Sequence, residues 1–127
     1  MEYDVVTWGT PVLTMEYDLI NTLNSKMKQL EVSVKQLRKS GTDYAEAERT
    51  YKMILTQECL RLRDEGMAIG LIDKIAYGIP KVADARFDRD VKTAIFTANK
   101  ESINAIKLAI RVISEQIKQE WGAELSD

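Results

Sequence analysis

Apolar residues recur along residues 16–39 at alternating steps of three and four. The members of this stripe are Ile20, Leu23, Met27, Leu30, Val34 and Leu37. Such steps place apolar side chains on one face of a helix, as at the a and d positions of a coiled coil. Ser40 and Gly41 follow directly, and glycine suits the left-handed position after a helix. The pattern therefore predicts a helix over 16–39 that stops at Ser40–Gly41.

A second apolar stripe begins immediately after this stop. Its members are Tyr44, Ala47, Tyr51, Ile54, Leu55, Cys59 and Leu62. Asp43 and Glu46 have the spacing of a capping box at a helix start, and Gly66 ends the pattern near residue 65. Because the link between the two predicted helices is only a few residues long, we expect them to form an antiparallel helical hairpin.

The chain then breaks over residues 60–90, which hold three of its six glycines and one of its two prolines. Residues 71–77 predict a short helix closed by Gly78, and Pro80 suits the first position of the helix that follows. So short a helix is not stable alone. Its apolar side chains must therefore pack against something, and these are Leu71, Ile72 and Ile75.

The last predicted helix runs over 80–121 without an internal glycine or proline. Its seam is traced by Val91, Ile95, Ala98, Ser102, Ile106, Ile110, Ile113 and Ile117. At 1.5 Å per residue this helix would measure about 60 Å, against about 36 Å for the first helix. The last helix should therefore overhang the hairpin, and a second copy of the chain is the simplest cover for its apolar seam.

These elements predict an all-α fold: an antiparallel helical hairpin, a short connecting helix and a long C-terminal helix, in a three-helix, coiled-coil-like bundle. Residues 15–127 would form a single domain, which suits a length of 127 residues. Residues 1–14 differ in character, with a Gly–Thr–Pro turn among apolar residues. We expect them to form an extended arm that packs onto the bundle or onto a neighbouring copy.

The amino-acid composition excludes several classes of protein and several kinds of functional site. The chain is 45% hydrophobic and 30% charged, with a net charge of −2, which is typical of a soluble globular protein and unlike a strongly basic nucleic-acid-coating protein. It has no histidine and a single cysteine, Cys59, so it lacks the commonest general base, Cys/His zinc sites and an internal disulfide. No apolar run reaches the length of a membrane span, and the N-terminus does not resemble a secretory signal. We expect a cytoplasmic protein that is not an enzyme and has no cofactor.

The break is the best candidate for a functional surface. Methionine, isoleucine and tyrosine suit protein interfaces, and charged residues crowd the start of the long helix. The candidate partner-binding residues are Met67, Ile69, Lys74, Tyr77, Arg86 and Arg89. The simpler interpretation of the charges is a solvated helix face held by ion pairs such as Arg86–Asp90 and Asp88–Lys92.

Two further hypotheses remain open at this point. Residues 24–40 are basic and could contact phosphates through Lys26, Lys28, Lys35, Arg38 and Lys39. The break could also act as a helix-turn-helix, although three aspartates begin its recognition helix. A magnesium site built from Glu65, Asp73, Asp84 and Asp88 is a weaker idea, since nearby arginines and lysines already balance these carboxylates.

The segment QECLRLRDEGMAIGLIDKIAYGIPKVADARFDRDVKTAIF resembles small helical proteins of temperate phages and prophages of Gram-positive bacteria. The shared features are helix punctuation: the 62–66 segment LRDEG, the closing Gly78 and the terminal Trp121–Gly122. The resemblance spans residues 16–122. It implies a phage context and a helical fold, with no catalytic residues. It agrees with an interaction protein that binds a host factor or a phage replication or recombination component.

Overall fold

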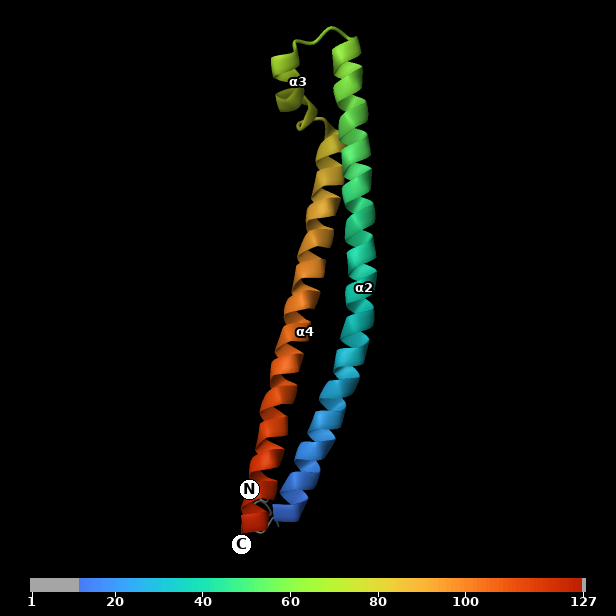
Figure 1. Ribbon diagram of the computed structural model, residues 1–127. Coiled ribbons are helices and arrows are strands. Elements are labelled where there is room, and N and C mark those ends of the chain that lie inside the picture. Colours follow the sequence, from blue (N-terminus) through green and yellow to red (C-terminus); the bar gives the residue numbers. More distant parts are fainter. Residues whose placement is uncertain (1–11, 127) are drawn as a thin grey trace, which may run out of the picture. The chain divides into compact units, whose positions relative to one another are not determined.

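The structure is a computed structural model that describes the backbone of residues 12–126 and the side chains of residues 17–122. It contains three helices, α2 (Val12–Asp64), α3 (Ile69–Ala76) and α4 (Pro80–Ser126), and no strand among the described residues (Figure 1). The predicted all-α fold is confirmed. Residues 12–14, which we assigned to an extended arm, begin α2, and the rest of the arm lies outside the described residues.

The predicted stop at Ser40–Gly41 is wrong, because α2 continues through both residues as one helix of 53 residues. The predicted hairpin between residues 16–39 and 43–65 therefore does not form. Gly41 does not end the helix. It allows a side chain of α4 to pack closely against the backbone of α2. A Cβ built on Gly41 would lie 3.2 Å from Cε1 of Phe96, whose ring packs on Tyr44 with centroids 5.9 Å apart. The absence of a side chain at Gly41 lets the aromatic ring lie close to the backbone of α2.

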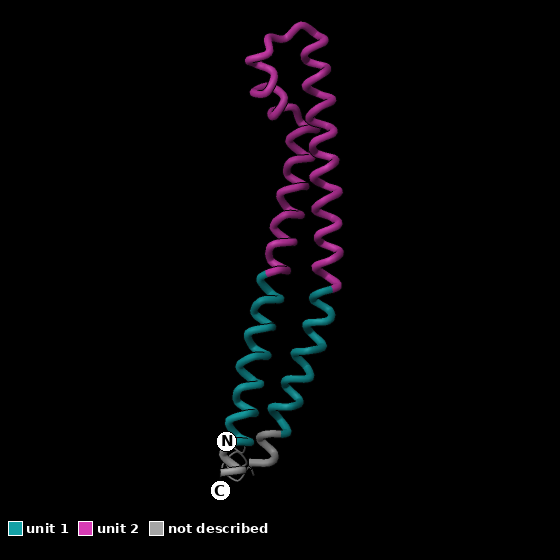
Figure 2. The backbone as a smooth tube through the Cα atoms, viewed as in Figure 1, with its two compact units in different colours: residues 1–34, 101–127 teal, residues 35–100 magenta. Residues whose placement is uncertain are grey.

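Because α2 does not break at Ser40–Gly41, the argument that the last helix overhangs a shorter hairpin and needs a second copy of the chain no longer holds. At 53 residues, α2 is longer than α4 with 47, so α4 has no shorter hairpin to overhang. The chain instead divides into two compact units (Figure 2). Unit 1 contains residues 1–34 and 101–127, and unit 2 contains residues 35–100.

Unit 1, in its described part, pairs the beginning of α2 with the end of α4 in antiparallel fashion (Figure 2). Ile103 and Ile113 of α4 are buried here. On α2 the predicted stripe is only partly correct. Leu23 and Leu30 are half-buried, whereas Met27 is 51% exposed. One partner helix covers only the middle of a wide apolar face, so the edge of the stripe stays in solvent.

Unit 2 pairs residues 35–64 of α2 with residues 80–100 of α4 and adds α3 (Figure 1). The buried side of α4 here carries Val82, which is fully buried, and the half-buried Arg89, Phe96 and Asn99. The predicted seam of Val91, Ile95 and Ala98 is wrong in this unit, since all three residues are exposed.

The difference has a geometric cause. The predicted seam advances by four residues three times in succession between residues 98 and 110. Such steps rotate the seam around the helix axis, so that its first residues lie on a different face from its last. Side chains that pack against one neighbouring helix recur instead at alternating steps of three and four.

Candidate interaction surface

The break at the end of α2 is built on Gly66. This residue has φ of +90°, which L-amino acids with side chains rarely adopt. The Gly66 N–H donates to the carbonyl of Arg63, and the Met67 N–H donates to the carbonyl of Leu62. These two bonds form a Schellman motif, which satisfies carbonyls at the end of a helix. The predicted role of Gly66 as the helix stop is confirmed.

The short helix α3 is anchored by one side. Its residues Ile72 and Ala76 are buried and form a cluster with Leu62 of α2. The half-buried side chains packed against this cluster are Leu55, Cys59, Met67 and Ile79. Met67 is half-buried against this core, which leaves only part of its side chain exposed, and its assignment to a partner-binding surface stays a prediction. It is the first residue beyond the glycine turn, and the Schellman geometry directs it back onto the preceding helix.

A buried carboxylate reinforces the start of α4 in unit 2. Glu58 is only 2% exposed, and both of its oxygens have basic partners. It forms ion pairs with Lys81, at the beginning of α4, and with Arg61, at 2.7 Å. Hydrogen bonds from Lys81 and Arg61 hold the pKa of Glu58 below its usual value of 4.5. Glu58 was not identified from the sequence, although its spacing in phase with Tyr51 and Leu62 places it on the buried side of α2.

Four apolar side chains in and directly after α3 are exposed, two of them, Leu71 and Ile75, on one face of the helix and two at its ends. Ile69 is 83% exposed, and Leu71, Ile75 and Tyr77 are each exposed by roughly half. We call these four residues the tip surface. Leu71 and Ile75 lie four apart and share a helix face with the exposed Lys74 at their side. The structure thus retains Ile69, Lys74 and Tyr77 as candidate contacts. It adds Leu71 and Ile75, which we had expected to be packed.

The two candidate arginines have different surroundings. Arg86 is exposed, and its guanidinium lies over the Tyr77 ring at 5.9 Å, next to the tip surface. Arg89 is half-buried on the other side of α4, with its guanidinium 4.5 Å from the Tyr51 ring centre. Ion pairs with Glu48 and Asp90 hold it there. Arg89 therefore makes packing contacts within unit 2, and its assignment to the partner-binding surface stays a prediction.

The predicted ion pairs at the start of α4 form only in part. Lys92 and Asp88 make the expected pair at 2.9 Å. Asp90 pairs with its neighbour Arg89 rather than with Arg86, whose guanidinium packs on Tyr77.

The five candidate basic residues of 24–40 are divided between the two units. Lys26 and Lys28 belong to unit 1, whereas Lys35, Arg38 and Lys39 belong to unit 2. Lys26 donates a hydrogen bond to Gln29, and Lys39 forms an ion pair with Asp43 at 2.9 Å. Lys35, Arg38 and Lys39 are all exposed, and Lys39 is already paired with Asp43.

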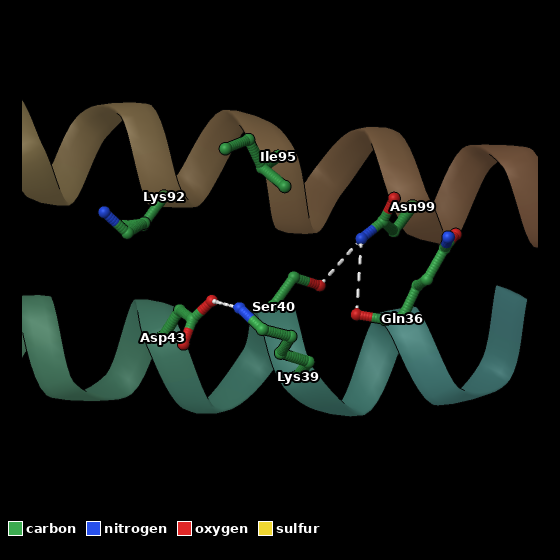
Figure 3. A pocket seen from close by; sticks show the side chains of 7 residues that line it. All are labelled: Gln36, Lys39, Ser40, Asp43, Lys92, Ile95 and Asn99. Carbon is green, nitrogen blue, oxygen red and sulfur yellow. Dashed lines mark hydrogen bonds and ion pairs between the residues drawn. The ribbon is translucent and has the colours of Figure 1, made fainter.

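An open groove of about 380 Å³ lies between α2 and α4 in unit 2 (Figure 3). Its floor is polar, because Asn99 Nδ2 donates to Ser40 Oγ at 2.9 Å and to the Gln36 carbonyl at 3.4 Å. Ser40 in turn donates to the carbonyl of Leu37. The two rim lysines, Lys39 and Lys92, are already paired with aspartates, so the groove offers no free charge for a ligand.

The structure does not support the hypothesis of a magnesium site. The acidic residues considered for magnesium are not gathered, because no three acidic or cysteine side chains in the described part of the chain could hold a metal ion. No helix within the described residues is long and apolar enough to span a membrane. Comparisons of the chain with protein-family models, with curated proteins and with solved structures find no match.

Proposed function

We propose that this chain is a non-enzymatic interaction protein that binds a protein partner through its tip surface. The supporting observation is the exposure of Leu71 and Ile75 on a short helix that is anchored by its buried Ile72, with Ile69 and Tyr77 exposed at the two ends of the helix. Exposed apolar side chains gathered in one place are typical of binding surfaces. The anchor formed by Ile72 presents them on a preformed helix.

Burial of the tip surface would supply part of the free energy of binding to a partner. Complete burial of an aliphatic side chain contributes about 1.5–3 kcal/mol, so covering the exposed parts of Ile69, Leu71 and Ile75 contributes about 4 kcal/mol. Tyr77 adds an aromatic ring of the kind that is enriched in interfaces. Little ordering is required because α3 is already folded, so less of this energy is offset on association.

The chemistry of the tip indicates the kind of partner. Lys74 beside Leu71 and Arg86 on Tyr77 place positive charge at the edge of the apolar residues, and the exposed Asp73 adds a negative charge. A complementary partner has an apolar depression bordered by charged groups of both signs. We place this interaction in the cytoplasm of a Gram-positive bacterial host, in a phage context, and we propose that the chain acts there as a homodimer.

The test is affinity capture from host lysate with three baits. The first is the wild-type chain, and the second carries Ile69→Ser and Leu71→Ser. The third, a matched control, carries Met53→Ser, which removes an exposed apolar side chain of α2 in the same unit. The proposal expects a protein that is captured by the wild type and the control and lost with the tip variant. Identical capture by all three baits would contradict it.

Nucleic-acid binding, through residues 24–40 or through the break as a helix-turn-helix, is the alternative outcome of a parallel titration. Fluorescently labelled single- and double-stranded DNA is titrated with the protein at two salt concentrations. Binding that weakens steeply with salt, and that is reduced by Lys35→Gln and Arg38→Gln, would favour the alternative. The tip variant serves as the control, since it leaves the five basic residues of 24–40 unchanged.

A further inference from the structure

In unit 1, α4 carries a stripe of mostly basic side chains beside its packed seam. Each member directly follows a buried or half-buried residue of the helix, and the members recur at alternating steps of four and three. They are Lys107, Arg111, Ser114, Lys118 and Trp121. Steps of this kind place the side chains on one helix face. We call these five residues the basic stripe of α4.

The basic stripe is accessible and has apolar neighbours on α2. Ser114 is half-buried and the other four members are exposed, with Trp121 exposed by 52%. On α2, Ile20 and Met27 are exposed by 39% and 51%, and each also directly follows a half-buried residue. In an antiparallel helix pair, residues that follow the packed positions lie on the same side of the pair on both helices. Basic and apolar side chains therefore share one side of unit 1.

The positive charge on this side is only partly balanced. Lys118 forms an ion pair with Glu115 at 3.6 Å, and Glu31 of α2 is exposed on the same side. Lys107 and Arg111, however, form no ion pair within the described part of the chain. Three basic side chains against two carboxylates leave an excess of positive charge toward Lys107 and Arg111, where an acidic group would be favoured.

We propose that residues 1–11 of the same chain bind along this side of unit 1 as an extended segment, parallel to α4. This segment contains two carboxylates, Glu2 and Asp4, and no lysine or arginine. It is joined directly to α2, which begins at Val12 in unit 1. A short tether raises the local concentration of a binding segment to the millimolar range, so weak contacts suffice to hold it. The proposal requires neither the tip surface nor self-association.

The order of side chains along the segment matches the order along the basic stripe. In an extended chain every second side chain points to the same side, so one face of the segment carries Glu2, Asp4, Val6 and Trp8. That face is acidic at its beginning and apolar at its end. The basic stripe has its two unpaired basic residues at its beginning and Trp121 at its end. Carboxylates therefore meet basic groups where the two aromatic rings meet each other.

The lengths agree as well. At about 3.3 Å per residue, Trp8 of an extended segment lies about 13 Å from Asp4 and about 20 Å from Glu2. At 1.5 Å per residue along a helix, Trp121 lies about 15 Å from Arg111 and about 21 Å from Lys107. Gly9, Thr10 and Pro11 supply turn residues that let the chain reverse before α2 begins. The opposite direction is excluded, because α2 begins beside the end of α4 (Figure 2).

The first test uses Trp8 as a fluorescent reporter. In a Trp121→Phe background Trp8 is the single tryptophan, and acrylamide is an uncharged quencher whose access does not depend on the protein's charge. We expect Trp8 to be quenched less in the folded chain than in urea. Arg111→Glu should lower the ratio of bound to free segment by about three- to tenfold, because an ion pair becomes a like-charge contact.

A charge exchange separates a direct contact from a general effect of charge. Asp4→Lys in the Arg111→Glu background should restore the protection of Trp8, because it recreates the pair with reversed signs. Lys28→Glu is the matched control, since Lys28 is exposed in unit 1 but follows an exposed residue and so lies off this side. It should leave the protection unchanged. Circular dichroism checks that each variant remains helical.

The second test locates the segment by cross-linking. With Cys59→Ser as background, Val6→Cys combined with Lys118→Cys should form a disulfide within one chain under mild oxidation. Val6→Cys combined with Val32→Cys, an exposed position elsewhere on α2 in unit 1, should form it far less. The mass under non-reducing conditions distinguishes a bond within one chain from a bond between two chains.

Four results would overturn the inference. Equal quenching of Trp8 in folded and unfolded protein would mean that the segment is unbound. Equal effects of Arg111→Glu and Lys28→Glu, or no restoration by Asp4→Lys, would remove the charge contact. Equal cross-linking at Lys118→Cys and Val32→Cys would remove the position. A disulfide between two chains would show that the segment of a second copy occupies this side. None of these results depends on the outcome for the tip variant.

Discussion

Replacing Gly41 with alanine tests whether this glycine is retained for packing in the middle of α2. Alanine is favoured over glycine inside a helix by about 1 kcal/mol. The added Cβ, however, would lie 3.2 Å from Cε1 of Phe96, closer than an ordinary van der Waals contact. Overpacking of this kind costs about 1–3 kcal/mol, so Gly41→Ala should be neutral to destabilising by about 2 kcal/mol in the wild-type background.

The decisive quantity is the coupling between Gly41 and Phe96. Phe96→Leu removes the ring carbon that the new methyl group would meet, at the cost of the stacking with Tyr44, about 1 kcal/mol. In that background, Gly41→Ala should stabilise the protein by close to its helix propensity. The double-mutant cycle should therefore give a coupling energy of about 1 kcal/mol or more.

The assay is urea unfolding followed by circular dichroism at a fixed protein concentration, because association would otherwise change the apparent stability. Gly70→Ala is the matched control, since nothing lies within 4 Å of a Cβ built on Gly70. It should stabilise the protein equally with Phe96 or leucine at position 96. Additive effects of Gly41→Ala and Phe96→Leu, within about 0.5 kcal/mol, would refute the packing explanation.

Two further predictions concern the break. Gly66→Ala should cost about 1–2 kcal/mol in urea unfolding, because a side chain is disfavoured at the positive φ of this position. Glu58 has a pKa lowered by Lys81 and Arg61, so its stabilising effect is complete above pH 4.5 and is lost as the pH falls through the lowered value. Unfolding measured from pH 6 to pH 2 should therefore show a shallower acid loss for Glu58→Gln than for the wild type, and equal slopes would contradict this assignment.

Helix content and the position of the break could be predicted from the sequence because both depend on local properties. Long stretches without glycine or proline and with helical periodicity favour helices wherever they pack. Gly66, Gly78 and Pro80 act through their own backbone geometry, which any fold must respect. The all-α fold, the end of α2 near residue 65 and the short helix that follows are the results of such local rules.

The continuity of α2 through Gly41 depended on a residue distant in the sequence. The same Ser–Gly pair can end a helix or admit an aromatic ring, and only the position of Phe96 decides between them. Ser40 is likewise satisfied by Asn99, which the sequence shows only as a weak point in an apolar stripe. A buried polar pair of this kind favours one register of two packed helices over its neighbours.

The candidate binding residues, too, could be predicted from the sequence only in part. The sequence by itself identified Ile69, Lys74, Tyr77 and Arg86 as candidates, because residue type and the nearby break are local facts. Only tertiary packing decided that Met67 and Arg89 lie in contacts within unit 2, and that Leu71 and Val91 remain in solvent. An apolar stripe in the sequence shows which side chains favour burial. The number and position of the neighbouring helices determine which of those side chains are buried.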